Sequence, residues 1–323
     1  MKALLCKQYG PPESLTVEEL APLQPEKDQV VISVKACGVN FPDTLIIQGK
    51  YQFKPPFPFA PGGEVAGIVK AVGENVKHLR EGDNVFAMPG WGGFAEELAV
   101  NANRAFLMPP NMDFKVAASL MYTYGTSYHA LKDRAQLKAG ETLLVLGAAG
   151  GVGLAAVNLG KIMGAKVIAA ASSDEKLALC KDYGADGLIN YSKEDLRESL
   201  KILTGGGVDV IYDPVGGEYA EPALRSLNWK GRYLVVGFAA GQIPSIPLNL
   251  ALLKGSAIVG VFWGAFAERE PKANFQNIME LFGFHQKGEL KPYIQKTYSL
   301  AEAPRALYDM LERRVMGKLV VTP

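Results

Sequence analysis

A glycine-rich segment gives the clearest sign of chemistry in this chain. Residues 143–153 are LLVLGAAGGVG, an apolar run that enters a glycine turn and opens an apolar helical pattern. Glycines in such a turn let the backbone approach a pyrophosphate, whose charge then lies at the helix N-terminus. A strand precedes the turn, and a helix and a second strand follow, as the motif requires. We predict a dinucleotide site at Ala149, Gly150, Gly151, Val152 and Gly153; a purely structural glycine turn is the alternative.

The end of the second strand bears on which nucleotide is bound. NAD sites place an acidic residue there to bind the ribose hydroxyls, whereas this chain has Ser172 and no acid. Lys176 can supply a positive charge, although as a point charge, and Tyr191 a phenolic donor. This combination favours NADPH as cofactor. In the alternative, Lys176 is an ordinary exposed helix residue and Asp174 or Glu175 binds the ribose.

Composition narrows the classes of function. Lys and Arg (34) nearly balance Asp and Glu (33), and no basic block suggests a nucleic-acid groove or a polybasic membrane patch. No run of 18 apolar residues exists, and the first residues do not resemble a signal peptide. The three cysteines lack pair spacing, which fits a reducing compartment. We expect a cytoplasmic protein that binds neither nucleic acid nor membrane.

The secondary-structure pattern changes along the chain. The first third is rich in short β-branched runs, and from residue 142 strands alternate with helices, as in βαβ units that build a parallel sheet. After residue 264, helices are expected at 274–286 and 301–311, with a closing strand at 318–321. Because the chain ends on a strand, we expect the tail to return to the first domain. The predicted α/β fold therefore has domains at 1–122 and 123–264, with 265–323 rejoining the first.

Four ordered motifs carry a resemblance to a known family. They are ACGVNFPD at 36–43, PGGEVAG at 61–67, GDNV at 82–85, and the glycine turn. Over nearly its whole length the chain resembles the medium-chain dehydrogenase/reductase superfamily, and its zinc-free quinone oxidoreductase (zeta-crystallin-like) branch in particular. The resemblance implies a GroES-like, β-rich catalytic domain, a Rossmann domain with a doubly wound parallel sheet, and a nicotinamide held between them. It also implies a homodimer paired through a sheet edge, for which 257–262 (AIVGVF) is suitable.

The resemblance also shows what this chain lacks. The positions that hold the catalytic zinc in zinc alcohol dehydrogenases are here Asn40, Gly63 and, by rough alignment, Tyr122. A tetrahedral zinc site needs thiolate, imidazole or carboxylate ligands, and three cysteines cannot form a four-cysteine lobe. We therefore predict no metal site. Alcohol oxidation needs a Lewis acid to stabilise the alkoxide, whereas a quinone or an enone is already electrophilic.

The expected reaction is therefore reduction of a quinone by NADPH, through hydride or electron transfer, without a metal ion. Reduction of an α,β-unsaturated carbonyl or acyl thioester is the nearest alternative. A non-catalytic protein that binds nucleotide or RNA, or serves as a structural protein, is an alternative of another class.

The resemblance places four residues near the reaction. Asn40 is expected to orient the nicotinamide ribose or the substrate carbonyl, with an Asx turn as its alternative role. Asp43 is expected mainly to hold the loop. Tyr51 is predicted to donate a proton or stack on a quinone, unless it is simply a packed aromatic residue. Thr126 is expected to face the nicotinamide, with a helix N-cap as the alternative.

Further cofactor contacts are expected at the ends of later strands, where ligands bind in open α/β sheets. Phe262 is predicted to close the pocket, whereas the neighbouring Trp263 has a core position as its alternative. The other predicted cofactor-binding residues are Val215, Gly237, Phe238 and Lys318.

Overall fold

The computed structural model describes all 323 residues and consists of two compact units. The first comprises residues 1–122 and 292–323, and the second comprises residues 123–291. The expected return of the tail at residue 265 is therefore wrong, because α9 (Trp263–Arg269) and α10 (Pro271–Gln286) belong to the second unit. Side chains on α10 hold it there: Glu280 accepts hydrogen bonds from Tyr128 (2.6 Å) and Lys132 (2.5 Å).

The first unit is built on antiparallel strands. Its long strand β3 (Gln29–Val39) pairs with β4 (Glu64–Val72) on one side. On the other side its first half pairs with β6 (Glu97–Asn101) and its last residues with β15 (Lys318–Thr322). The sheet order is β14-β15-β3-β4-β5-β7, and two further strands, β1 and β2, pair separately. The remaining strands are β1 (Lys2–Leu5), β2 (Thr16–Glu19), β5 (Asn84–Ala87), β7 (Ala105–Leu107) and β14 (Ile294–Ser299).

The first unit has one apolar core, and short helices complete the unit. Alternate residues of β3 and β4, such as Ile32 and Val65, are fully buried in its apolar core, because one face of each strand is turned inward. The end of the chain packs against this core through Ala306 and Leu307, so residues 292–323 belong to this unit. The helices are η1 (Pro12–Ser14), α1 (Phe41–Ile46), η2 (Ala102–Arg104), α2 (Phe114–Ala117), η6 (Leu300–Glu302) and α11 (Ala303–Leu311).

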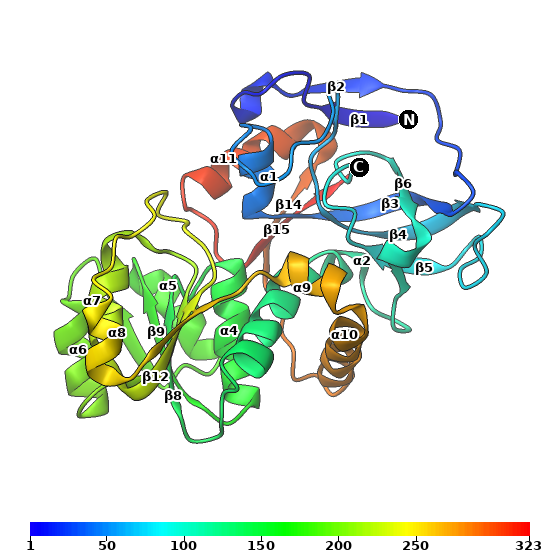
Figure 1. Ribbon diagram of the computed structural model, residues 1–323. Helices are drawn as coiled ribbons and strands as arrows, with labels where there is room; N and C mark the ends of the chain where they lie inside the picture. The colour runs from blue at the N-terminus through cyan, green and yellow to red at the C-terminus, as the bar shows by residue number, and fades with distance from the viewer. The chain divides into compact units, whose positions relative to one another are not determined.

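The second unit contains the predicted doubly wound parallel sheet. Its strand order is β10-β9-β8-β11-β12-β13, and each neighbouring pair is parallel. The order reverses beside β8, so that α4 lies on one side of the sheet while α6, α7 and α8 gather on the other (Figure 1). The strands are β8 (Thr142–Leu146), β9 (Lys166–Ala171), β10 (Gly187–Asn190), β11 (Val208–Asp213), β12 (Leu227–Val235) and β13 (Ala257–Gly260).

The helices of the second unit include an irregular run before β8. The sequence pattern becomes helical near residue 117. In the structure this stretch contains π-helical η3 (Met121–Gly125), α3 (Thr126–Tyr128) and π-helical η4 (His129–Arg134). The others are α4 (Gly151–Ile162), α5 (Asp174–Asp182), α6 (Leu196–Thr204), η5 (Gly217–Tyr219), α7 (Ala220–Arg225), α8 (Asn249–Lys254) and the two of the tail. None of the helices combines the length and apolarity that crossing a membrane requires.

Candidate active site

The glycine turn connects β8 to α4 with the geometry of a phosphate-binding turn. Gly147 has φ +57°, a left-handed conformation that favours glycine. A Cβ on Gly153 would lie 2.3 Å from the carbonyl oxygen of Gly147, so only glycine allows this close contact between helix and strand. The first backbone N–H groups of α4 have no acceptor within the helix. They are available to a phosphate at the helix N-terminus.

The end of β9 carries the residues that the sequence predicts for binding a 2′-phosphate. Lys176 Nζ donates to Ser172 Oγ at 3.3 Å, and the backbone N–H of Tyr191 donates to Ala171 O at 3.2 Å. The side chains of Ser172 and Lys176 and the backbone of Tyr191 therefore lie at this strand end. The Tyr191 ring also packs on that of Tyr219, with ring centroids 4.4 Å apart.

Asp174, the alternative ribose ligand, is already engaged. Its two carboxylate oxygens accept hydrogen bonds from Asn190 Nδ2 and Lys193 Nζ, both at 2.6 Å. These two donors hold the pKa of Asp174 below its usual value, with Lys193 the larger cause. The carboxylate is thus neutralised within its own unit.

Asp213, at the end of β11, organises the next loop and was not among the predicted residues. Its carboxylate accepts N–H bonds from Val215 (2.7 Å) and Gly216 (2.9 Å) and a bond from the Tyr233 hydroxyl. Burial raises the pKa of Asp213, against the lowering effect of these donors. The loop brings Val215 to the glycine turn, since a Cβ on Gly147 would lie 2.7 Å from a Val215 methyl group.

The other cofactor contacts predicted in the second unit, Gly237, Phe238 and Phe262, have different surroundings. Gly237 N donates to Asp213 O at 3.3 Å, and the Phe238 ring lies 2.9 Å from where a Cβ on Gly216 would be, so both belong to the Asp213 loop. Phe262 is 57% exposed, whereas Trp263 is buried and donates to Asn274 Oδ1 at 3.1 Å. Trp263 therefore takes the core position named as its alternative.

In the first unit, Asn40 and Asp43 lie at the start of α1. The Asp43 carboxylate accepts N–H bonds from Asn40 (2.7 Å) and Gly62 (3.1 Å), so it links α1 to the PGGE loop. Burial raises the pKa of Asp43 from 3.8 to about 6, although the two N–H bonds and the charge of Lys318 oppose this. The predicted loop-holding role of Asp43 agrees with this geometry.

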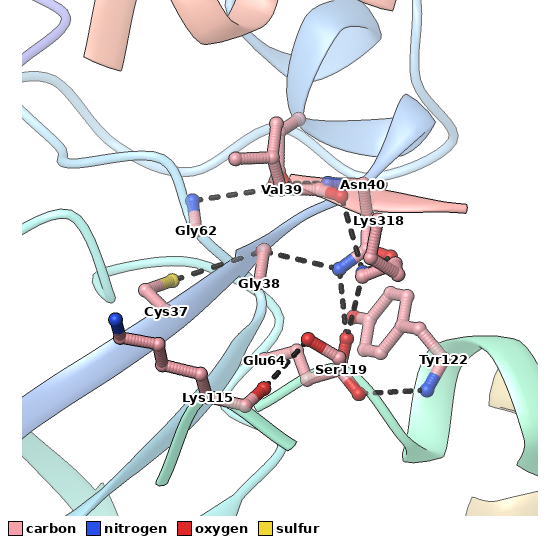
Figure 2. A network of polar contacts seen from close by, with 11 residues as sticks. Cys37, Gly38, Val39, Asn40, Gly62, Glu64, Lys115, Ser119, Tyr122 and Lys318 are labelled. Carbon is pink, nitrogen blue, oxygen red and sulfur yellow. Dashed lines mark hydrogen bonds and ion pairs between the residues drawn. The ribbon is translucent and has the colours of Figure 1, made fainter. Parts of the chain in front are cut away.

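The Asn40 side chain belongs to a buried polar cluster with Lys318 and Glu64 (Figure 2). Lys318 Nζ donates to Asn40 Oδ1 at 2.6 Å, to Glu64 Oε2 at 3.1 Å and to Val39 O at 3.1 Å. Asn40 Nδ2 in turn donates to Glu64 Oε2 (3.1 Å) and Gly38 O (3.2 Å). Asn40 is also the N-cap of α1, in a capping box with Asp43, so the turn role named as its alternative is present beside these contacts.

Glu64 and Gly38 are the residues of this cluster that sequence reasoning missed. Glu64 Oε1 also accepts the Tyr122 N–H at 3.0 Å, so this carboxylate joins three segments. A Cβ at position 38 would lie 2.0 Å from Ala118 O and 2.9 Å from Glu64 Oε2. The sequence did contain one signal for this cluster, because Glu64 is a charged residue at an apolar strand. A charge that is buried there requires a partner.

Two tyrosines lie beside this cluster. Burial and the charge of Asp43 raise the pKa of Tyr51, and the same two causes hold the pKa of Tyr122 well above its usual value. Both phenols are therefore protonated at neutral pH. Tyr51 is half-buried and makes an edge-to-face contact with Phe53, with centroids 5.5 Å apart.

Thr126 lies in the second unit at the first position of α3. Gly125 before it already has helical dihedrals, φ −61° and ψ −47°, so Thr126 is not a helix N-cap and that alternative is wrong. The next residue, Ser127, donates to the carbonyl oxygen of Val152 at 2.8 Å. This bond ties α3 to the first turn of α4.

The residues present do not fit a zinc ion at the positions suggested by the resemblance. Asn40 Oδ1 is bonded to an ammonium group, Gly63 has no side chain, and Tyr122 is a protonated phenol. No group of three His, Cys, Asp or Glu side chains in the structure has a geometry suited to a metal. A buried ion pair of Lys318 with Glu64, at 3.1 Å, occupies this place in the fold.

Comparisons with known proteins agree with this architecture. Residues 26–110 match the profile of the alcohol dehydrogenase GroES-like domain, and residues 151–282 match that of the zinc-binding dehydrogenase family. Quinone oxidoreductase-like protein 2 of Bos taurus is 38% identical, over 99% of this chain and 92% of the relative.

Two solved structures are similar along the whole chain. The Escherichia coli quinone oxidoreductase in complex with NADPH has a TM-score of 0.94 and 31% identity, with both chains fully covered. The CurK enoyl reductase has a TM-score of 0.89 and 27% identity, with 99% of this chain and 98% of that one covered. From its sequence and its fold, this chain belongs to the quinone oxidoreductases of the medium-chain dehydrogenase/reductase superfamily.

Proposed function

We propose that this protein reduces quinones with NADPH and without a metal ion. The observation that carries the proposal is the buried cluster of Lys318, Asn40 and Glu64, in which an ammonium group bonds the side chain at a zinc-ligand position. Without a Lewis acid, an alkoxide has no strong stabilising partner. An acceptor that is already electrophilic needs none.

The second unit supplies the features for binding NADPH. The N-terminus of α4 would hold the pyrophosphate, and Ser172, Lys176 and Tyr191, at the end of β9, would hold the 2′-phosphate. The bound cofactor supplies a hydride from the nicotinamide ring. The E. coli relative is described as a complex with NADPH, which supports this choice.

The first unit supplies a proton donor. A quinone that accepts a hydride becomes a hydroquinone anion, which needs one proton to become the hydroquinone. Tyr51 keeps its phenolic proton because burial and Asp43 raise its pKa. A phenol that is protonated at neutral pH can donate that proton to the hydroquinone anion, directly or through water, and the raised pKa makes Tyr51 a weaker acid than a free phenol.

Steady-state assays separate quinone reduction from enone reduction. NADPH oxidation is followed with 1,4-benzoquinone, 9,10-phenanthrenequinone, 2-cyclohexenone and crotonyl-CoA. We expect turnover with the quinones. Faster turnover with crotonyl-CoA would favour the enoyl reductase reading, which the similarity to CurK supports. Tight NADPH binding without oxidation by any acceptor would favour a non-catalytic role.

Metal analysis tests the proposal that the reaction needs no metal ion. We expect no stoichiometric zinc in the purified protein, and no loss of quinone reduction after treatment with a chelator. A zinc ion retained at one per chain, with turnover lost on its removal, contradicts metal-free chemistry.

We also infer that the protein is a cytoplasmic homodimer paired through β13. This edge strand has one hydrogen-bonded neighbour, β12, and its Ile258 is 40% exposed. An uncovered apolar edge strand is a ready template for pairing with a second chain.

A further inference from the structure

The second unit contains a cavity that the proposed reaction does not use. Helices α6, α7 and α8 lie together on one side of the parallel sheet (Figure 1), and α7 contacts both of the others. Residues of all three helices line an open cavity of about 410 Å³. This volume is within the range of sites that bind small molecules.

The cavity is separate from the glycine turn. It is bordered by Gly207, which precedes β11, and by Leu227, the first residue of β12, whereas the turn follows the last residue of β8. These three strands are parallel, so their starts and their ends lie at opposite edges of the sheet. The cavity is therefore independent of the proposed nucleotide site.

Cations outnumber carboxylates among the side chains that line the cavity. The charged ones are Arg197, Lys201, Arg225, Lys254 and a single carboxylate, Glu198. Arg225 is neutralised by Glu221, which accepts hydrogen bonds from its Nε at 2.9 Å and its Nη2 at 2.6 Å. The other three cations make no ion pair within the chain. Together with Glu198 they leave the cavity with a net charge of +2.

Lys254 is held in place by the chain and keeps one donor free. Its Nζ donates to Arg225 O at 2.6 Å and to Leu227 O at 2.5 Å. Because an ammonium group has three N–H donors, the third remains for a ligand. Burial and the charge of Arg197 lower the pKa of Lys254, since like charges repel each other. An anion bound between these two cations would relieve the repulsion.

Trp229 gives the cavity an aromatic wall. A Cβ added to Gly255 would lie 3.3 Å from Cη2 of this indole, so the ring rests on the backbone there. The residue is nevertheless 69% exposed, so most of its surface is uncovered. A large aromatic side chain in this state offers a surface on which a planar ring of a ligand can stack.

We propose that this cavity binds a small phosphate monoester that carries an aromatic ring, with the phosphate among Arg197, Lys201 and Lys254 and the ring on Trp229. A phosphate monoester has a charge of about −1.5 to −2 near neutral pH, which matches the excess of positive charge. Charge-assisted bonds from guanidinium and ammonium groups to phosphate oxygens are among the strong hydrogen bonds of proteins. A carboxylate ligand would neutralise only half of the excess.

Isothermal titration calorimetry with phenyl phosphate tests the proposal. Inorganic phosphate, which lacks the ring, and phenol, which lacks the phosphate, are titrated in parallel. We expect phenyl phosphate to bind once per chain. Inorganic phosphate should bind about 3- to 10-fold more weakly, the contribution of an aromatic contact, and phenol at least tenfold more weakly. Saturating NADPH should not change these affinities, because the two sites lie at opposite edges of the sheet.

Substitutions in the cavity locate the site. Arg197 and Lys201 are exposed on α6, and alanine is a good helix former, so their alanine variants should fold. Each should weaken phenyl phosphate binding about tenfold, the effect of losing a hydrogen bond between charged groups. Trp229→Ala should weaken the binding of phenyl phosphate and leave that of inorganic phosphate unchanged. Lys181→Ala, at an exposed lysine of α5, is the matched control and should alter neither.

Three results would overturn the inference. One is a wild type that phenyl phosphate does not saturate. Another is unchanged affinity in both Arg197→Ala and Lys201→Ala, or displacement of the probe by NADPH, since either places the probe elsewhere. The third is an equal affinity for phenyl phosphate and inorganic phosphate that Trp229→Ala does not change, which means an adventitious ion only.

Discussion

At the scale of single residues, two buried carboxylates of the first unit have opposite surroundings. Glu64 contacts the Lys318 ammonium and accepts two further N–H bonds. Asp43 accepts two backbone N–H bonds but contacts no cation, and burial raises its pKa to about 6. Glu64 therefore neutralises a fixed charge, while Asp43 changes its own charge just below neutral pH.

The raised pKa of Asp43 predicts a pH dependence of stability. Its folded pKa of about 6 lies above its ordinary value of 3.8, so the stability it contributes is present below pH 3.8 and lost as pH rises through 6. We expect the free energy of unfolding of the wild type, relative to Asp43→Asn, to fall by about 2 kcal/mol between pH 4 and pH 7. Urea denaturation at a series of pH values measures it. The charged and titratable groups around Asp43 are Cys37, Tyr51, Glu64, Tyr122 and Lys318.

The lysine at the start of α5 predicts selectivity for the phosphorylated nucleotide. Lys176→Ala should raise the KM for NADPH about tenfold, the effect of losing a hydrogen bond to a charged group, and leave the KM for NADH nearly unchanged. Lys181→Ala, an exposed lysine of the same helix, is the control. Equal effects of Lys176→Ala on both nucleotides would remove this residue from phosphate recognition.

At the scale of elements, the glycine turn depends on how closely α4 approaches β8. Gly153→Ala would place a Cβ 2.3 Å from Gly147 O and must push the helix away. We expect it to lower the Tm and to weaken NADPH binding at least tenfold, which titration by fluorescence can measure.

Another helical glycine provides the control for this substitution. Gly283 in α10 has no atom within 4 Å of the added Cβ, so Gly283→Ala should keep NADPH affinity and raise stability by about 0.5–1 kcal/mol. NADPH affinity retained in Gly153→Ala would show that the close approach is not needed for binding.

Some helices and strands could be predicted from the sequence, and the unit to which others belong could not. β8 was predicted at its observed bounds and α4 within two residues, because a buried strand, a glycine turn and a helix form one local pattern. The tail was predicted to return, but 27 residues too early, because α10 is held by Tyr128 and Lys132, more than 140 residues away in the chain. Long-range polar partners leave no local periodicity.

In the candidate site, single residues could be predicted from the sequence, whereas the contacts between them could not. Asn40 was predicted from the resemblance and Lys318 as a cofactor contact, but nothing in the sequence indicated that they bond to each other. The partnership arises from the pairing of β15 with β3, which joins residues 278 positions apart. Glu64 lay within the PGGEVAG motif, but its role depends on the buried ammonium of Lys318, which comes from the far end of the chain.

At the scale of the whole molecule, the edge strand β13 predicts the oligomeric state. We expect a dimer in light scattering coupled to size exclusion. Ile258→Lys should shift it to monomer, because a charge on a pairing edge opposes association. Ile202→Lys, on α6 and 81% exposed, should leave the dimer intact. A monomeric wild type contradicts the proposed pairing.

The position of β15 in the chain also sets an order of events during protein synthesis. By the time residue 291 has been translated, every strand of the second unit exists, and that unit can fold on the ribosome. The first unit at that moment still lacks β14 and β15, so the last residues of β3 have no partner on the edge that β15 later covers, and Glu64 lacks the Lys318 ammonium. The first unit therefore completes its sheet only after the last residues have been synthesised. A transcript cut short before codon 318 would yield a complete second unit, with its nucleotide-binding fold, and an incomplete first unit.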